Sequence, residues 1–241
     1  KMILIIRPKK DSKDLLEDLN KINSQVYFEQ FSNYKIRDFD FDFDPNHFFL
    51  ISSKQTIQSL LRKASLKNQL AKKGKLFVIG RKVERELKKS NFRLIVKTFL
   101  NSSEFISYIK QNYKNQIYIN HLTGSVANKK LVLFSKTKNI NLNFIETYTV
   151  KFKKSISVKL KNLFKQKKIQ FMFHYSLKAS EVFYETLFDD EKLYFKNKIT
   201  HFCMSSRIKK GLLKLNVRSS QTYFAKTANH DSLMLLFHNK C

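Results

Sequence analysis

Chemistry in this sequence is expected at Tyr148 and at turns where a strand gives way to a helix. Tyr148 shares one face of the strand FIETYTVKF (144–152) with Phe144 and Glu146. A phenol with an unperturbed pKa near ~10 is protonated at neutral pH, which suits a proton donor. The alternative interpretation of Tyr148 is structural, as a tyrosine packed between two strands.

Other chemistries leave little trace in the sequence. The histidines at 121, 174 and 201 each stand singly in an expected strand, and no Cys/His spacing is typical of a metal site. Cys203 lies in an apolar run, where a core thiol is favoured over a nucleophile. With 4 glycines in the whole chain, no Gly-rich phosphate loop is present. No metal or cofactor is therefore expected.

The net charge is strongly positive, because Lys+Arg number 47 and Asp+Glu 19, which gives +28. Such a charge suggests an acidic partner: nucleic acid, an anionic membrane, or a phosphate or polycarboxylate ligand. Only eight of the basic residues are Arg, the side chain that best matches phosphate geometry. We therefore attribute most of the excess to lysines accumulated at surface positions, as in proteins from A/T-rich genomes.

The compartment is expected to be reducing and cytoplasmic. The chain has 2 cysteines, Cys203 and Cys241, too few for a disulfide framework. Its longest apolar runs are too short to span a bilayer. The first of them, MILIIRP (2–8), meets Arg-Pro at once and is expected to be a first strand and not a signal peptide.

Strands and helices are expected to alternate along the chain. Apolar runs predict strands at 3–7, 25–31, 47–53, 75–80, 92–99, 116–122, 140–148, 169–176, 199–205 and 217–225. Helical spacing predicts helices from the Asp11–Ser12 cap through Leu15, Leu19 and Ile22, and at 54–66, 81–91, 103–112, 156–168, 177–188, 207–216 and 229–239. Residues 126–134 carry no clear pattern. This alternation predicts an α/β fold with mainly parallel sheets.

A weak internal repeat predicts two lobes. Residues 49–60 align with 172–183, which places Ser53 on Ser176 (176 − 53 = 123). Residues 75–93 align with 200–218, which places Gly80 on Ser205 (205 − 80 = 125). The strand–helix–strand of 3–31 then corresponds to 117–148, so the lobes are related by circular permutation. We expect a first lobe of 1–33 and 152–241, an inserted second lobe of 42–143, and two side-by-side hinge crossings at 34–41 and 144–151. A small-molecule site is expected in the cleft between the lobes.

The order of these motifs resembles the uroporphyrinogen-III synthase family over essentially the whole chain. The likeness is carried by ILIIRP (3–8), FLISSKQTI (49–57), VIGRKVERELKKSNF (78–92), INHLTG (119–124), the ETY of 146–148 and FHYSLKASEVF (173–183). Departures from the family pattern are Ile6 for a Thr before Arg-Pro, Ser205-Ser206 for the second Gly turn, and Val83 and Ile208 for a Thr after each Gly turn.

The resemblance implies two flavodoxin-like lobes with parallel sheets flanked by helices, joined by a two-stranded hinge. It also implies a cofactor-free, monomeric cyclase that closes hydroxymethylbilane to uroporphyrinogen III, inverting the last pyrrole ring and losing water. Tyr148 is the expected catalytic proton donor. The expected substrate-binding residues lie at strand-to-helix turns, where free amides favour carboxylates: Arg7, Ser53, Lys54, Gln55, Gly80, Arg81, Lys82, Ser176, Lys178, Ser206 and Arg207.

Alternatives remain at these positions. Ser53 and Ser176 could serve only as helix caps, and Arg7 could form a salt bridge at the hinge. The chain as a whole could be a non-catalytic basic module of the same fold that binds nucleic acid or another polyanion. Most aromatic residues, however, have the spacing of core positions and not of an exposed stacking surface, so no nucleic acid and no membrane partner are expected.

Overall fold

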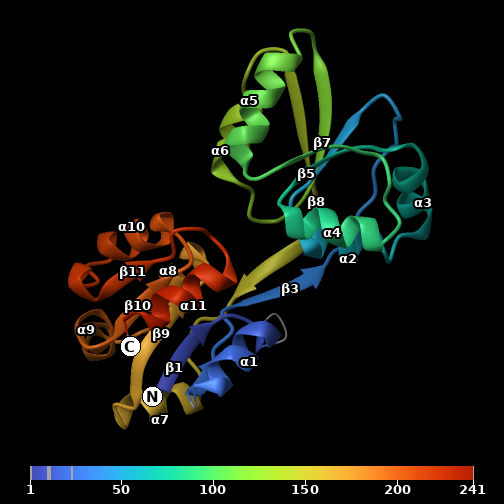
Figure 1. Ribbon diagram of the computed structural model, residues 1–241. Helices are drawn as coiled ribbons and strands as arrows, with labels where there is room; N and C mark the ends of the chain where they lie inside the picture. The colour runs from blue at the N-terminus through green and yellow to red at the C-terminus, as the bar shows by residue number, and fades with distance from the viewer. Residues whose placement is uncertain (1, 10–11, 23, 241) are drawn as a thin grey trace. The chain divides into compact units, whose positions relative to one another are not determined.

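A computed structural model describes residues 2–9, 12–22 and 24–240 (Figure 1). The chain divides into two compact units, 1–33 with 152–241, and 34–151. The segments 34–41 and 144–151, expected as hinge crossings, are grouped with the second unit. Asp11, expected as part of a helix cap, and Cys241 lie outside the described residues.

The first unit contains a parallel sheet in the order β11-β10-β9-β1-β2 within the described chain. Its strands are β1 (Met2–Ile6), β2 (Gln25–Phe28), β9 (Ile169–His174), β10 (Thr200–Cys203) and β11 (Thr222–Phe224). Its helices are α1 (Lys13–Lys21), α7 (Val158–Lys165), α8 (Leu177–Glu185), α9 (Asp189–Asn197), α10 (Ser206–Lys214) and α11 (His230–His238), with a 3₁₀ helix at Ser219–Gln221.

Both faces of this sheet are covered, which explains why its strands are continuously apolar. Because side chains alternate along a strand, Leu4 and Met172 join a core under α8 and α10. Their neighbours Ile5 and Phe173 join a second core under α1 and α11. The apolar layers on either side hold the carboxyl ends of β1, β9 and β10 at one edge.

The second unit contains a sheet in the order β3-β8-β7-β4-β5-β6 within the described chain. Its strands are β3 (Ser32–Ile36), β4 (Phe48–Ile51), β5 (Lys75–Ile79), β6 (Ile95–Phe99), β7 (Ile117–Gly124) and β8 (Ile140–Phe152). Its helices are α2 (Lys54–Leu60), α3 (Ala64–Lys73), α4 (Arg81–Lys89), α5 (Ser102–Asn112) and α6 (Lys129–Phe134). The pairs β4–β5, β4–β7, β5–β6 and β7–β8 are parallel.

The two sheets share one strand order. Numbered along the chain, the first sheet reads 2-1-3-4-5, the order of flavodoxin-like folds. The second reads the same once β7 and β8 are counted first, with β3 added beside β8. The predicted α/β fold with flanked parallel sheets is confirmed, and the strand order agrees with the permuted repeat.

Several predicted boundaries were wrong. The single helix predicted at 54–66 is two helices, because the chain turns at residues 61–63, where Lys63 N–H donates to the Leu60 carbonyl at 2.9 Å. Helix α9 was missed, although three acidic residues in its first turn are a helix-start signal. The patternless segment 126–134 contains α6. Ile22, expected in the core, is 38% exposed at the end of α1.

None of the described helices has both the length and the apolar character that crossing a membrane requires.

Candidate functional site

Three neighbouring strands of the second unit bring candidate residues to one edge. Ser53 follows β4, Gly124 ends β7, and Tyr148 lies in β8, beside β7. Parallel strands present their carboxyl ends at a common edge, which is where ligands bind in open α/β sheets. The strand predicted at 140–148 and the strand predicted at 144–152 are one continuous strand, β8, which ends at Phe152.

A β-bulge lets β8 continue past this edge. Thr123 pairs with Glu146, but the next residue of β7, Gly124, pairs with Tyr148, so Thr147 is the extra residue. Thr147 is fully buried, and its hydroxyl donates to the Thr123 carbonyl at 3.1 Å. Bulges re-aim side chains locally, and here two successive residues, Thr147 and Tyr148, are both buried.

The phenol of Tyr148 is held on more than one side. The side chain is 8% exposed, and its ring meets the ring of Tyr34 edge-on, with centroids 5.8 Å apart. Burial raises the pKa of Tyr148, and a hydrogen bond with the Ser53 side chain partly opposes that rise. The phenol is therefore protonated at neutral pH and can act as a donor but not as a base.

Ser53 and Ser176 both cap helices, which was the alternative to ligand binding predicted for them from the sequence. The Ser53 hydroxyl accepts from the backbone N–H of Gln55 at 3.1 Å and donates to the Gln55 side-chain oxygen at 2.9 Å. The Ser176 hydroxyl accepts from the backbone N–H of Ala179 at 3.4 Å. Ser53 differs from Ser176 in that it also contacts the candidate catalytic residue, Tyr148.

The other two strand-to-helix turns lack a side-chain cap. Gly80 is the N-cap residue of α4, with φ 100 and ψ 124, and its own N–H donates to the Phe99 carbonyl at 2.8 Å. Ser205 is the N-cap residue of α10, and its hydroxyl makes no capping hydrogen bond. First-turn amides without a side-chain cap can accept an anion, whose charge the helix dipole also favours. These amides belong to the exposed candidates Arg81, Lys82, Ser206 and Arg207.

The remaining charged candidates have partners within the chain. The Arg7 guanidinium lies over the ring of Tyr175, 4.6 Å from its centroid. Burial raises the pKa of Tyr175 to about 12 despite this neighbouring cation. Lys54 lies 3.9 Å from Glu86, and Lys178 lies 3.8 Å from Glu181, all four with well-exposed side chains. Exposed pairs of this kind contribute little to stability and are easily exchanged for a ligand.

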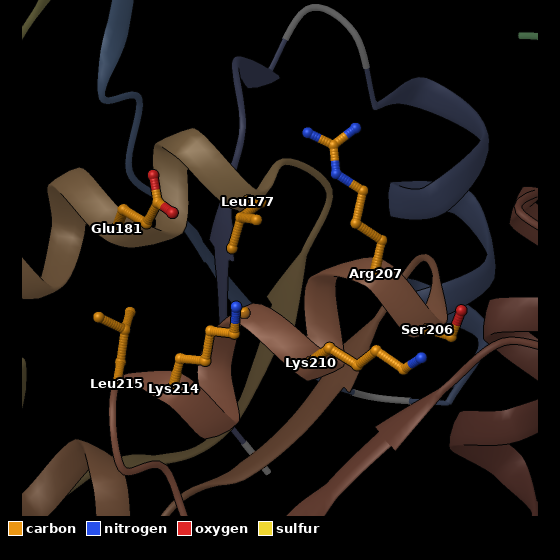
Figure 2. Close-up of a pocket in the computed structure, with 8 residues that line it drawn as sticks. Leu177, Glu181, Ser206, Arg207, Lys210, Lys214 and Leu215 are labelled. Carbon is orange, nitrogen blue, oxygen red and sulfur yellow. The ribbon is translucent and has the colours of Figure 1, made fainter. Parts of the chain in front are cut away.

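A groove in the first unit runs between α8 and α10 (Figure 2). It measures about 410 Å³ and is lined by Leu177, Glu181, Ser206, Arg207, Lys210, Gly211, Lys214 and Leu215. Figure 2 shows Lys214 reaching toward Leu177, whereas Arg207 and Lys210 point away in different directions. The candidates Ser206 and Arg207 thus share one groove, but its cations do not converge on a point.

Residues that were not predicted as site residues complete the edge of the second sheet. His121 is 1% exposed, and its Nε2 lies 3.1 Å from the hydroxyl of Ser52, the residue before Ser53. Burial lowers the pKa of His121 to about 4, so the imidazole is neutral. Gly124 and Thr147 form the bulge beneath Tyr148. A glycine inside a strand is a known bulge signal, so Gly124 in INHLTG was the available clue.

Two histidines form a buried chain of hydrogen bonds in the first unit. His201 Nε2 lies 2.7 Å from the Phe195 carbonyl, which can only accept, so this nitrogen carries the hydrogen. His174 Nε2 lies 3.0 Å from His201 Nδ1, and His174 Nδ1 lies 2.8 Å from the hydroxyl of Ser180, which donates to the Ser176 carbonyl at 2.8 Å. Each ring nitrogen has a polar partner, and burial lowers the pKa of both rings, so both are neutral. Within the described residues, no group of three or more His, Cys, Asp or Glu side chains is placed to hold a metal ion.

The fold is similar to that of solved uroporphyrinogen-III synthases. The crystal structure of uroporphyrinogen-III synthetase from Helicobacter pylori is 13% identical, with a TM-score of 0.70 over 100% of both chains. A mutant uroporphyrinogen III synthase from Thermus thermophilus is 10% identical, with a TM-score of 0.64 over 100% of this chain and 98% of that one. At such low identities the likeness shows the fold alone.

Comparison with curated proteins gives no match. The family model described as uroporphyrinogen-III synthase HemD, in contrast, matches residues 28–234, which is most of the chain and covers parts of both units. The resemblance noted in the motif order, the paired flavodoxin-like sheets and this match agree, and the chain belongs to the uroporphyrinogen-III synthase family.

Proposed function

We propose that this protein closes hydroxymethylbilane to uroporphyrinogen III, with inversion of the last pyrrole ring and loss of water, in tetrapyrrole (haem) biosynthesis. The observation that carries the proposal is the family match over residues 28–234. The geometry at Tyr148 supports it, because a cyclase of this kind needs a neutral proton donor near a surface that holds carboxylates. On this proposal the enzyme is a hydro-lyase.

The substrate carboxylates are proposed to bind at the carboxyl edges of both sheets. Hydroxymethylbilane has two carboxylates on each of its four pyrrole rings. The turns at Gly80–Lys82 and Ser205–Arg207 offer amides without side-chain caps at equivalent places in the two units. Ser53, Gln55 and Ser176 lie at the two capped turns. The cations Arg7, Lys54, Arg81, Lys82, Lys178 and Arg207 add charge, each pair giving ~1 kcal/mol at ~4 Å in water and ~4 kcal/mol where water is partly excluded.

Tyr148 is proposed to protonate the leaving group. The bond between the hydroxymethyl carbon and its oxygen breaks, and the electron pair stays with the oxygen. The phenol hydrogen of Tyr148 joins that oxygen, so water departs. The substituted α-carbon of the last pyrrole then attacks the cationic carbon and gives a spiro intermediate. The bond from that α-carbon to the methylene bridge of the third ring breaks, the bridge carbon becomes cationic and bonds to the free α-carbon of the last pyrrole, and the proton lost from that carbon restores the phenol. General-acid assistance of this kind contributes on the order of 10²-fold.

Most of the catalysis is assigned to positioning. Loss of hydroxide from the activated hydroxymethyl group is easy, and the uncatalysed closure yields the type I isomer. An enzyme that holds the chain so that its ends meet in the inverted geometry therefore acts mainly by orientation. This division of labour suits a site with one proton donor and many carboxylate contacts.

We propose a cytoplasmic monomer that needs no metal or cofactor. Cys203 is buried and outside any disulfide, in keeping with a reducing compartment.

The test is a reaction of purified protein with hydroxymethylbilane in metal-free buffer, with the isomers separated after oxidation to porphyrins. We expect the type III isomer at a rate far above that of spontaneous closure. Type I product formed at the uncatalysed rate would contradict the proposal. Steeply salt-dependent binding of RNA or DNA by such an inactive protein would favour the polyanion-binding alternative.

A further inference from the structure

Gly124 has no side chain at the point where β7 passes beneath the ring of Tyr148. A Cβ atom built on Gly124 would lie 2.4 Å from Cε2, 2.5 Å from Cζ and 2.9 Å from the hydroxyl oxygen of Tyr148. Carbon atoms in contact normally stay about 3.5–4.0 Å apart. The backbone of Gly124 is not in the left-handed region, so its conformation alone does not demand glycine. Glycine is required at position 124 because the ring of Tyr148 occupies the space of a Cβ atom.

Tyr148 is tied at several other points. Its carbonyl accepts from the N–H of Ser125 at 3.0 Å, and the preceding Thr147 is anchored inside the bulge. Its ring meets Tyr34 edge-on, and its hydroxyl reaches Ser53. The backbone of Tyr148 is therefore fixed, and the movable part is the end of the side chain. A methyl group at position 124 would push that end away from Ser53.

We propose that Gly124 is a positioning residue for the reaction: its missing side chain makes the space in which the phenol of Tyr148 lies, with the hydroxyl at Ser53. Its effect on the reaction rests on the proposed function, in which Tyr148 donates a proton to the leaving hydroxide. Its effect on the ring does not, because the contact between Gly124 and Tyr148 exists whatever the protein catalyses.

The position of the ring can be measured without any activity. Protein with ¹³C-labelled tyrosine gives ring signals, and the Tyr148 signal is the one lost in Tyr148→Phe. In Gly124→Ala we expect this signal to shift, because the ring can no longer occupy its place over position 124. The matched control is Gly74→Ala, whose Cβ would crowd the Leu70 carbonyl oxygen at 2.7 Å in the same unit. It should leave Tyr148 unchanged.

The kinetic constants of the variants distinguish a positioning role of Gly124 from a general disruption of the fold. Displacing a catalytic group by about 1 Å can cost up to ~10²-fold, so kcat of Gly124→Ala should fall about 10- to 100-fold with little change in KM. In the double variant Gly124→Ala/Tyr148→Phe, kcat should be within about twofold of Tyr148→Phe alone, because the hydroxyl is already gone. Multiplying effects in the double variant would show that Gly124 acts by another route and would overturn the proposal.

A stability cycle covers the case in which Gly124→Ala folds poorly. If the crowding is with Tyr148, removing the ring relieves it, so Gly124→Ala should lower Tm in the wild type but far less in Tyr148→Ala. An equal loss in both backgrounds, or a double variant that fails to fold where Tyr148→Ala folds, would overturn the proposal. If the wild type makes no type III isomer, the proposed function fails, while the Tyr148 signal and this cycle still decide the role of Gly124.

Discussion

The two units share one sheet order but place their polar residues differently. Alignment of the repeat sets His174 of the first unit opposite Ile51 of the second (174 − 123 = 51) and His201 opposite Leu76 (201 − 125 = 76). All four side chains are fully buried. The first unit therefore holds a satisfied polar chain, Ser180–His174–His201, where the second unit holds hydrocarbon.

At the carboxyl edges of the two sheets it is the second unit that carries the additional polar residue. Strand β2 pairs with β1 in regular register and ends at Phe28, whereas β8 continues through a bulge and carries Tyr148. Tyr148 of the second unit thus lies at the edge where a ligand would bind, whereas His174 and His201 of the first unit lie within the core. The same scaffold thus supports a structural polar network in one unit and a candidate proton donor in the other.

The largest expected effect is a loss of stability in acid that originates in the first unit. Burial lowers the pKa of His201 to about 4 and that of His174 well below its ordinary value. Because the unfolded chain binds protons near pH 6.5 and the folded chain does not, stability is full above pH 6.5 and falls as pH drops toward 4. His201 alone implies a loss on the order of 3 kcal/mol at 1.36 kcal/mol per pKa unit.

Urea unfolding from pH 4.5 to 7.5 measures this loss. The double variant His174→Ile/His201→Leu, which installs the residues of the second unit, should reduce the pH dependence and leave the contribution of His121, whose pKa is also lowered to about 4. A slope unchanged by the double variant would mean that the buried pair is not the source.

A smaller effect is expected from the uncapped turns. Gly80 has φ 100, and a Cβ there would meet Val83 only at an ordinary 3.7 Å, so the cost of Gly80→Ala is backbone strain. That cost is about 1–3 kcal/mol. Ser205, its equivalent, has φ −158, which any residue adopts, so Ser205→Ala should change stability by less than about 0.5 kcal/mol. Equal thermal shifts for the two variants would show that the turns are not strained differently.

The smallest effect is expected from the two capping serines. Ser53→Ala and Ser176→Ala should each cost about 1 kcal/mol in urea unfolding, because each loses an N-cap hydroxyl. Only Ser53 hydrogen-bonds Tyr148, and that bond lowers the pKa of the phenol. The Tyr148 signal should therefore titrate at higher pH in Ser53→Ala and be unmoved in Ser176→Ala. If Tyr148 titrates at the same pH in both variants, Ser53 does not act on Tyr148 and is not part of the site.

Periodicity and spacing were enough to predict the alternating elements, the permuted repeat and the turns, because each depends on a local pattern. The bulge was missed, because Gly124 is only a hint of it and the mismatch itself depends on the register between β7 and β8. The partners of His121, His174 and His201 were missed for the same reason, because hydrogen bonds between strands depend on register. Val83 and Ile208, which depart from the family pattern at the Gly turns, are buried and pack in the hydrophobic cores.

The most direct test of Tyr148 as the proton donor is the turnover and isomer ratio of Tyr148→Phe. We assign steering to carboxylate contacts at the sheet edges, and we assign to Tyr148 only the donation of a proton to the leaving hydroxide. We expect turnover to fall on the order of 10²-fold, Tm to stay nearly unchanged, and the remaining product to be the type III isomer. Full turnover would make Tyr148 structural, and a switch to the type I isomer would contradict the separation of steering from proton donation.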